Sequence, residues 1–402
     1  MQAATQTALQ KNIEKIRNGE FGTPYNATGG AMVVMNVKTG EVLAMASYPD
    51  FDPSKFIFGI DPELYNQYNS KATKALRNRA TQEIYPPGSI FKMVTAIAGL
   101  ETGAITTTSK INDVGRYSLY SDSPRYCWKR SGHGYLNVTQ AIQHSCNYFF
   151  YEVGNRIGID TLAKYTKYFG LGTKTGIELP GEEKGTLNER TEGNVWLPGN
   201  TLSAAIGQLD NMFTPLQMVK YASMLANGGK AINPTIIKAI KNVDGTEVPR
   251  EEYEAYFNER FGIEKTQIED LNIKQENLDA VLEGMRSVTS ESGGTAYSTF
   301  KNFTIEVGGK TGSAQTQMVD ENGEKITHAW FLGFAPFDEP EIAVVVMVEG
   351  GGSRRLYSWG GTWCYGTIFW NESKSSSRKC NSITIYWGTK LKVIVRNIII
   401  YF

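Results

Sequence analysis

The stretch YPPGSIFK, residues 85–92, holds a hydroxyl and an amine at a spacing that suits nucleophilic catalysis. Proline favours the first turn of a helix, because its φ is fixed and its missing N–H is no loss there. Residues three apart share a helix face, so Ser89 and Lys92 can meet one turn apart. A serine hydroxyl is a poor nucleophile until a base takes its proton, and a lysine that loses its charge on burial can be that base.

A second motif, Ser145-Cys146-Asn147, offers another hydroxyl and an amide. The hydroxyl of Ser145 can pass a proton on to a leaving amine. The amide of Asn147 can hold the backbone of a substrate. Together with Ser89 and Lys92, these groups predict the cleavage of an amide through a serine ester.

A third motif, residues 310–313 with the sequence KTGS, follows late in the chain. Lys310 and Thr311, on an expected edge strand, would bind a substrate carboxylate. Gly312 and Ser313 complete the substrate-binding stretch. The backbone N–H groups of Ser89 and Ser313 would form an oxyanion hole. Acylation of the serine and then deacylation are the steps that this set predicts.

Two of these motifs recur elsewhere, so sequence context must separate the copies. The other copies are S-x-x-K at residues 298–301 and 376–379, and K-T-G at residues 38–40 and 174–176. Only Ser89 has prolines before it and an apolar run, MVTAIAGL, after it, as a buried catalytic helix requires. Only Lys310 follows the strand-like FTIEV, residues 303–307, and a Gly-Gly pair that allows close backbone approach. Any one motif alone is more typical of an ordinary polar residue, and the ordered combination carries the interpretation.

The elements that must position these motifs indicate one α+β domain. Residues 31–47 contain two strand-like runs around a Lys-Thr-Gly turn, which predicts a hairpin. Residues 89–102 predict an apolar helix, and residues 137–228 are mostly helical in pattern, with helices that end at glycines. Strand signals return in three late stretches, residues 303–315, 328–336 and 340–351. Strands at both ends with helices between them predict a sheet that distant segments close.

Composition narrows the class of protein. The 402 residues are 41% hydrophobic, enough for one large core or two smaller ones, and 41 basic residues balance 41 acidic ones. Zero net charge gives no general field for nucleic acid, so we expect no nucleic-acid partner. The longest apolar run, residues 342–348, is far short of the roughly 18 residues of a bilayer span, and we find no anchor or signal peptide. Four cysteines are no disulfide framework.

The three motifs in this order are the signature of penicillin-binding proteins and class A β-lactamases. Over residues 28–353 the chain resembles the transpeptidase domain of a class B, monofunctional penicillin-binding protein. The matching stretches include VKTGEVLAMASYPDFDP, RNRATQEIYPPGSIFK, GHGYLNVTQAIQHSCNYFFYEVG, IGQLDNMFTPLQM and GGKTGSAQ. The GHGYLNVTQA and SCNYFF neighbourhood is most similar to elongation-type and sporulation-type members. The resemblance implies the penicillin-binding protein/serine β-lactamase-like fold, an antiparallel sheet covered by helices with an all-helical subdomain.

The resemblance also implies an activity. A member of this family is a peptidoglycan D,D-transpeptidase that attacks the D-alanyl-D-alanine end of a stem peptide, releases D-alanine and transfers the acyl group to an amine on a neighbouring strand. β-Lactams would inhibit it covalently at Ser89, and the chemistry needs no cofactor. A glycosyltransferase and cell-wall assembly proteins are the implied partners. The full-length protein would act at the extracytoplasmic face of the bacterial cell membrane.

A cluster of metal-binding residue types lies around the second motif. Cys127, His133, His144 and Cys146 fall within one short stretch, and zinc favours such ligands, although their spacing matches no standard finger. Some elongation-type relatives carry a zinc site here, and the resemblance places it on Asp113, Cys127, His133 and Cys146, with Cys127 in place of an acidic residue. The alternative is a small buried Cys146 and a His133 that makes loop hydrogen bonds. We expect His144 to be a helix-face residue.

We expect three segments: a truncated N-terminal lead-in at residues 1–30, the transpeptidase domain at 31–353, and an atypical tail at 354–402. Relatives would continue after GGGS with a glycine- and alanine-rich turn into a final apolar helix. This chain instead continues with RRLYSWGG. Codons for residues 354–360 exist that, read one base later, give GGYTAGG. We therefore hypothesise a frameshift near Ser353, which the nucleotide sequence would test.

Two other interpretations remain at the level of sequence. A serine β-lactamase or a β-lactam sensor domain shares the three motifs, but the matched stretch is longer than those compact enzymes need, and no glutamate motif for a deacylating water is recognisable. An inactive scaffold fragment is the non-enzymatic alternative. The complete set of motif residues argues against it, whereas the altered tail makes a loss of activity credible.

Overall fold

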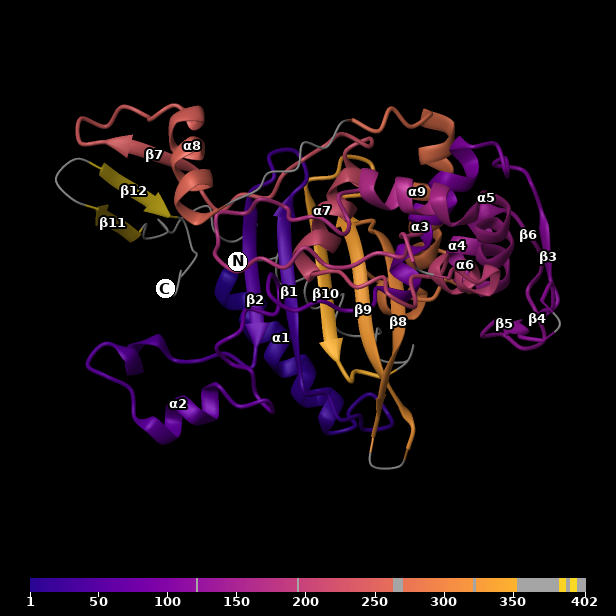
Figure 1. Ribbon diagram of the computed structural model, residues 1–402, viewed down its shortest axis with the longest axis horizontal. Helices are drawn as coiled ribbons and strands as arrows, with labels where there is room; N and C mark the ends of the chain where they lie inside the picture. The colour runs from indigo at the N-terminus through magenta and orange to yellow at the C-terminus, as the bar shows by residue number, and fades with distance from the viewer. Residues whose placement is uncertain are drawn as a thin grey trace.

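The computed structural model describes residues 1–120, 122–193, 195–262, 270–320, 323–352, 383–387 and 391–395. At its centre lies a five-stranded antiparallel sheet in the order β2-β1-β10-β9-β8 (Figure 1). Its strands are β1 (Gly29–Asn36), β2 (Val42–Tyr48), β8 (Gly308–Val319), β9 (Lys325–Ala335) and β10 (Ile342–Glu349). The first hairpin pairs with the late strands, so the prediction of a sheet closed by distant segments is confirmed.

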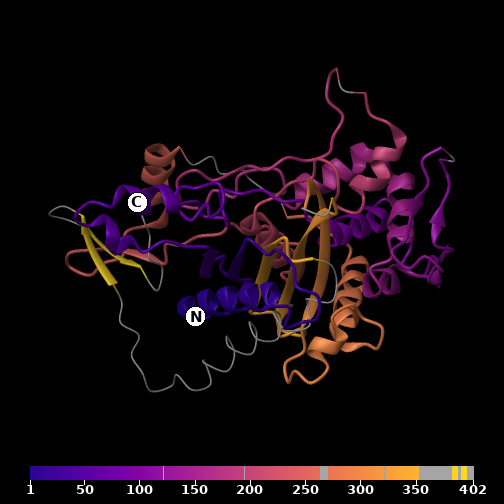
Figure 2. The same cartoon turned by 90° about the horizontal axis from the view of Figure 1, so that it is seen from below.

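Helices cover both faces of this sheet. Consecutive residues of β1 are buried from Gly29 to Met35, although alternate side chains point to opposite faces. Helix α1 (Gln2–Arg17) packs on β1 and β2 through Leu9 and Ile13, which belong to the main core, and Figure 2 shows it running along the sheet. The elements that pack on the later strands are α7 (Pro215–Ala226) and α9 (Gln275–Ser290). The predicted lead-in thus contributes a helix to the core of the domain.

The predicted helix after the prolines is present, with a different first turn. A 3-10 turn, η2 (Gly88–Phe91), leads directly into α3 (Lys92–Glu101). Gly88 has φ of 55°, which lies in the left-handed region and outside the α-helix. The backbone of β8 comes so close that a Cβ on Gly88 would lie 2.6 Å from the carbonyl oxygen of Ser313. This glycine therefore permits the turn and its contact with the sheet.

A helical region lies beside the β8 edge of the sheet, at the right of Figure 1. It holds α4 (Val138–Gln143), α5 (Asn147–Tyr168), α6 (Pro198–Ala204) and the short strands β3 (Ile111–Asp113), β4 (Arg116–Tyr117), β5 (Arg125–Tyr126) and β6 (Gly134–Leu136). The helical pattern predicted from residue 137 onward is interrupted between α4 and α5. Ser145 adopts φ of 52° there, which no α-helix accommodates.

One predicted strand, residues 303–315, is present but begins later than expected. Residues 303–307 are not in a strand, and β8 begins at Gly308. The carbonyl of Val307 accepts a hydrogen bond from Thr289 of α9, and that of Glu306 accepts the backbone N–H of Phe337. These contacts use the polar groups of the segment outside the sheet, so its apolar pattern reflects packing and not pairing.

The remaining elements are not strands of the central sheet. They are η1 (Pro53–Phe56), α2 (Pro62–Tyr68), β7 (Ala239–Asn242), α8 (Arg250–Phe261), α10 (Tyr297–Phe300), β11 (Ile383–Trp387) and β12 (Leu391–Val395). Strand β12 pairs with β11 and β7. Apart from these two strands, the tail in which we expect altered sequence lies outside the described residues. Among the helices that are described, none has the length and apolar character to span a bilayer.

Candidate active site

The first two motifs meet at the amine of Lys92. This lysine is fully buried, and its backbone N–H donates to the carbonyl of Ser89 one short turn earlier. Its Nζ donates to Asn147 Oδ1 at 2.7 Å, to the Ser145 carbonyl at 2.9 Å and to Ser145 Oγ at 3.3 Å. The structure therefore brings the hydroxyl and the amide of the second motif to the amine of the first, and Ser89 lies one short turn before that amine.

A strained turn presents the second motif to Lys92. Helix α4 ends at His144, Ser145 takes the left-handed conformation, and α5 starts at Asn147. Cys146 is the N-cap of α5, where its Sγ accepts the backbone N–H of Phe149 at 3.3 Å. For a residue with a Cβ the left-handed conformation costs roughly 1–2 kcal/mol, and such strain is concentrated at functional sites. The turn directs the hydroxyl of Ser145 and the amide of Asn147 toward the amine of Lys92.

The third motif lies on β8, the edge strand of the described sheet. Lys310 and Thr311 are buried, and Lys310 Nζ donates to the Thr311 carbonyl at 2.9 Å. A Cβ on Gly312 would lie 3.0 Å from the carbonyl oxygen of Pro87, so glycine lets the strand pack on the serine turn. With Gly88 against Ser313, two glycines bring the backbones of motif one and motif three into contact. All three motifs thus share one site.

Sequence reasoning missed one residue of this site. Thr295, on the loop after α9, shares a hydrogen bond of 2.7 Å with the hydroxyl of Thr311. This contact fixes the direction of the Thr311 hydroxyl beside the place predicted for a substrate carboxylate. The only local signal is the Gly293-Gly294 pair that frees the loop, and a glycine pair alone does not indicate a partner on another element.

The structure separates the motif copies as their context predicted. Ser298 is exposed on the short helix α10, and Lys38 is exposed in the hairpin turn. Lys174 lies in a loop after α5. The remaining copy, at residues 376–379, is outside the described residues. Of the copies that are described, only those at Ser89 and Lys310 lie on elements that pack against each other, η2 and β8.

The four predicted metal ligands also come together. The donor atoms of Asp113, Cys127, His133 and Cys146 all lie within 4.8 Å of one another. The sulfurs of Cys127 and Cys146 are 4.0 Å apart, Cys127 Sγ is 3.6 Å from His133 Nδ1, and Cys146 Sγ is 3.3 Å from Asp113 Oδ2. His133 Nδ1 lies 2.6 Å from Asp113 Oδ2. Because Cys146 is the middle residue of the second motif, this cluster directly adjoins the active site.

The electrostatics of the cluster favour one thiolate. The hydrogen bond that Cys127 shares with Cys146 lowers the pKa of the Cys127 thiol to about 2, although burial acts against it. Burial, followed by the hydrogen bond to Cys127, raises the pKa of Cys146. Burial also acts to lower the pKa of His133, but its contacts with Cys127 and Asp113 raise it overall. The Cys127 thiolate is a buried negative charge that a cation would complement, and His133 would have to lose its proton to bind one.

His144 lies beside this cluster and outside it, as expected. Its ring stacks on that of His133 at a centroid distance of 5.7 Å. Its Nδ1 lies 3.2 Å from the carbonyl oxygen of Gly293, which ties the end of α4 to the loop that carries Thr295. The prediction placed it correctly outside the ligands, but His144 is the C-cap in the turn after α4 and not a helix-face residue.

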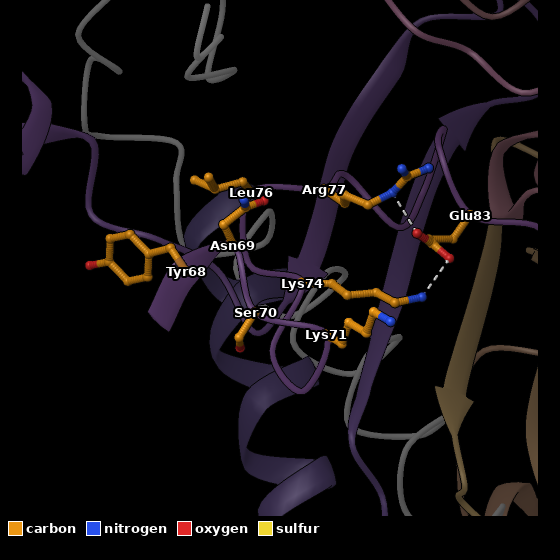
Figure 3. Close-up of a pocket in the computed structure, with 8 residues that line it drawn as sticks. All are labelled: Tyr68, Asn69, Ser70, Lys71, Lys74, Leu76, Arg77 and Glu83. Atoms are coloured by element: carbon orange, nitrogen blue, oxygen red, sulfur yellow. Dashed lines mark hydrogen bonds and ion pairs between the residues drawn. The ribbon is translucent and has the colours of Figure 1, made fainter. Parts of the chain in front are cut away.

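A hollow of about 210 Å³ lies away from the motifs, in the segment between β2 and the serine turn (Figure 3). It is lined by Tyr68, Asn69, Ser70, Lys71, Lys74, Leu76, Arg77 and Glu83. Glu83 pairs with Lys74 at 3.2 Å and with Arg77 at 2.5 Å, so the carboxylate is satisfied within the hollow. These ion pairs hold the segment in place and suggest no reaction.

Comparison with known proteins gives a consistent result. Residues 30–362 match the model of the penicillin binding protein transpeptidase domain. The peptidoglycan D,D-transpeptidase MrdA of Acinetobacter baumannii is 33% identical over 337 residues, which are 80% of this chain and 48% of the relative. Stage V sporulation protein D of Bacillus subtilis is 34% identical over 359 residues, 89% of this chain and 50% of the relative.

A solved complex between penicillin-binding protein PBP2 and MreC from Helicobacter pylori holds a chain with the same fold. The two chains are 28% identical, superpose with a TM-score of 0.74, and share 91% of this chain and 63% of that one. The chain spans about half the length of the curated relatives it matches.

Proposed function

The chain belongs to the penicillin-binding protein transpeptidase family, with the elongation-type and sporulation-type members among its relatives, and from this premise we propose that it is a peptidoglycan D,D-transpeptidase. It joins stem peptides through an acyl ester on Ser89, and β-lactams form a lasting ester on the same oxygen. The observation that carries the proposal is the buried amine of Lys92, one turn after Ser89 and in contact with Ser145 and Asn147.

The first half-reaction transfers the acyl group to the serine. An ammonium has three donors, and three oxygens lie within 3.3 Å of Lys92 Nζ. As a neutral amine it keeps two donors and gains a lone pair, which takes the proton of Ser89 as Oγ attacks the penultimate D-alanyl carbonyl. The C–N bond to the last D-alanine breaks, and Ser145 hands a proton to the leaving amine and takes one back from Lys92. The product is a serine ester.

The second half-reaction reverses the roles of these groups. An amine on a neighbouring strand attacks the ester, its excess proton returns through the same hydroxyl and amine, and Ser89 is released as the new amide forms.

Lys310 and Thr311 bind the carboxylate of the incoming donor peptide, and the Asn147 amide holds its backbone. The N–H groups of Ser89 and Ser313 stabilise the oxyanion, which is supported by the close packing of the serine turn on β8.

The substrate fixes the setting of this reaction. Stem peptides and their acceptor amines are part of the wall, so the domain works at the extracytoplasmic face of the bacterial cell membrane. A glycosyltransferase that extends the glycan strands and cell-wall assembly proteins are the partners we propose. The complex of the Helicobacter pylori relative with MreC supports a partner of the second kind.

We further propose that the cluster beside Cys146 holds a structural zinc ion. A regular tetrahedron with bonds of about 2.0 to 2.3 Å has edges of about 3.3 to 3.8 Å, and two of the sulfur distances, 3.3 Å to Asp113 and 3.6 Å to His133, fall in that range, while the sulfurs themselves are 4.0 Å apart. Thiolate, imidazole and carboxylate are ligands that zinc prefers. Asp113, Cys127, His133 and Cys146 would hold the ion, which would cross-link the β3 and β6 strands to the start of α5.

Two histidine variants test the zinc proposal without reference to activity. His133→Gln removes a proposed zinc ligand, whereas His144→Gln changes a histidine that stacks on His133 but is not a ligand. We expect about one zinc per chain by elemental analysis in the wild type and in H144Q, and little in H133Q. A chelator should lower the Tm of the first two proteins and leave that of H133Q unchanged. Equal zinc content in both variants would overturn the ligand assignment.

Labelling with a fluorescent penicillin tests the proposed reaction. The wild type should form one adduct with the mass of the opened lactam, and Ser89→Ala should form none. Ser298→Ala is the matched control, because it removes the serine of the other described S-x-x-K copy, and it should label like the wild type. Equal labelling of S89A would reject the nucleophile, and rapid turnover of a chromogenic cephalosporin would instead indicate a β-lactamase.

A further inference from the structure

A buried polar network ties the end of the sheet to the loop before the catalytic serine. Glu349, at the end of β10, accepts hydrogen bonds at Oε1 from the Tyr85 hydroxyl at 2.7 Å and from Arg79 Nε at 3.0 Å. Its other oxygen accepts the hydroxyl of Thr28 at 3.0 Å. Arg79 is 1% exposed, so this is a desolvated ion pair and not a surface contact. Position 29 is glycine, since a Cβ there would lie 2.8 Å from Arg79 Nε.

Arg79 extends the network toward the segment in Figure 3. Its terminal nitrogens donate to the carbonyls of Thr73 at 2.8 Å and of Lys74 at 3.3 Å. Its backbone N–H donates to the hydroxyl of Ser47 on β2. The guanidinium of Arg79 therefore joins the loop that carries Lys74 to Glu349 at the end of β10, and the backbone N–H of the same residue adds a link to β2.

Tyr85 is the point where the network reaches the serine loop. Its backbone N–H and carbonyl both pair with Phe213, and its ring packs edge-on against His328 and Trp330 of β9. The indole N–H of Trp330 donates to the carbonyl of Pro86 at 2.9 Å. The residues that follow are two prolines with fixed φ, so the backbone from Tyr85 to Pro87 has little freedom to absorb a shift, and Gly88 is held by its contact with Ser313.

We propose that Arg79, Tyr85 and Glu349 form a buried brace that positions the Ser89 turn against the sheet, which makes Tyr85 a positioning residue for acylation. This inference rests on the proposed function of Ser89. The brace acts at the carboxylate of Glu349, which holds the arginine and the tyrosine at one oxygen. A misplaced nucleophile slows the chemical step more than binding, because only the transition state needs its exact geometry.

Tyr85→Phe tests the brace. It removes the hydroxyl and keeps the ring that packs on His328 and Trp330, so the variant retains the fold. Acylation by a chromogenic cephalosporin is measured over a range of concentrations, well below the Tm, which separates the noncovalent constant KS from the acylation rate k2. We expect k2 to fall about 10-fold and KS to stay within about twofold of the wild type.

Tyr117→Phe is the matched control, because it also removes a tyrosine hydroxyl that donates a hydrogen bond to a glutamate paired with an arginine. The Tyr117 hydroxyl donates to Glu152 at 2.8 Å, and Glu152 pairs with Arg156 at 2.8 Å, so this tyrosine also joins a carboxylate and an arginine. It lies on β4, away from the serine loop. We expect Y117F to lower the Tm and to keep the wild-type k2.

The outcomes separate the brace from the proposed function. A wild-type k2 in Y85F, or an equal loss of k2 in Y117F, overturns the brace while Ser89 still forms its adduct. If the wild type forms no more adduct than S89A, the proposed reaction itself fails. A loss confined to KS would also contradict a positioning role for Tyr85.

Discussion

The two sides of Ser89 are built by different means. On the helical side, Lys92 meets Ser145 and Asn147 through side-chain contacts between α3 and a strained turn. On the sheet side, the register of β8 with β9 places Lys310 opposite Leu332 and Thr311 opposite Phe331, so main-chain hydrogen bonds set their positions. The helical side depends on a few side-chain contacts, whereas the positions of the residues on the sheet side are set by the many main-chain hydrogen bonds between β8 and β9.

This difference indicates which part of the reaction each side of Ser89 serves. Proton transfer needs groups within hydrogen-bond reach of each other, and the helical side holds its groups at such distances. Binding a carboxylate needs donors on a rigid surface, which an ordered strand supplies. We therefore expect the side chains that transfer protons on the helical side to set mainly the acylation rate k2, and the side chains that bind a carboxylate on the sheet side to set mainly the noncovalent constant KS. The predictions below test that division.

The largest effect should follow from Lys92→Met on the helical side. Loss of the base should lower k2 by about 1,000-fold or more, within the usual range for a general base. Intact-mass kinetics of the penicillin adduct measure it.

Lys220→Met is the control for the loss of a buried amine. Lys220 lies on α7, where burial lowers its pKa to about 8 and its Nζ donates to Asn233. Its k2 should equal that of the wild type. A similar loss in both variants would mean that burial of an amine, and not its place beside Ser145, determines the rate.

A smaller effect should follow from Gly88→Ala, at the seam between the two sides. Alanine must adopt φ of 55° there, and its Cβ would lie 2.6 Å from the carbonyl oxygen of Ser313. We expect a loss of stability of about 2–4 kcal/mol and a k2 about 10-fold lower, measured by thermal unfolding and by the same kinetics.

Gly103→Ala separates the cost of the left-handed backbone from the cost of the close contact with β8. Gly103 also has a left-handed φ, of 72°, but a Cβ there meets nothing within 4 Å. It should therefore show only the conformational cost, about 1 kcal/mol, with an unchanged k2. Equal losses in the two variants would show that contact with β8 contributes nothing.

Much of this arrangement could be predicted from local sequence. The prolines before Ser89, the apolar run after it and the glycines before Lys310 indicated which motif copies matter, and the hairpin at residues 31–47 is present as predicted. These signals are local, because propensity and periodicity act within a turn or a strand. The order of the three motifs then indicated that one site contains them.

The rest depends on partners that are distant in sequence. Glu349 binds Tyr85, 264 residues earlier, and a glutamate at a strand end carries no sign of such a partner. The left-handed Ser145 was missed because only the packing of α4 and α5 against Lys92 compensates for its strain. Thr295 was missed for the same reason, since its partner lies on another element. Tertiary contacts decide these details, and a single sequence does not display them.

The smallest effect should come from pH on the sheet side. Burial acts to raise the pKa of Glu349, but the charge of Arg79 and the hydroxyl of Tyr85 hold it below the usual 4.5. A folded pKa below the unfolded one means that the contribution to stability is complete above about pH 4.5 and is lost as pH falls through the folded pKa. The Tm advantage of the wild type over Y85F should therefore shrink from pH 6 to pH 3. A constant difference would show that the hydroxyl does not act through this carboxylate.

The division between the two sides is tested most directly by one pair of acylation kinetics, Ser145→Gly against Thr311→Val. Glycine keeps the left-handed turn and removes only the hydroxyl, and valine keeps the shape of threonine. The account predicts that S145G lowers k2 about 100-fold with KS near the wild-type value, and that T311V weakens KS about 10-fold with k2 nearly unchanged. If S145G weakened KS alone, or T311V lowered k2 alone, the assignment of chemistry to the helical side and of binding to the sheet side would be contradicted.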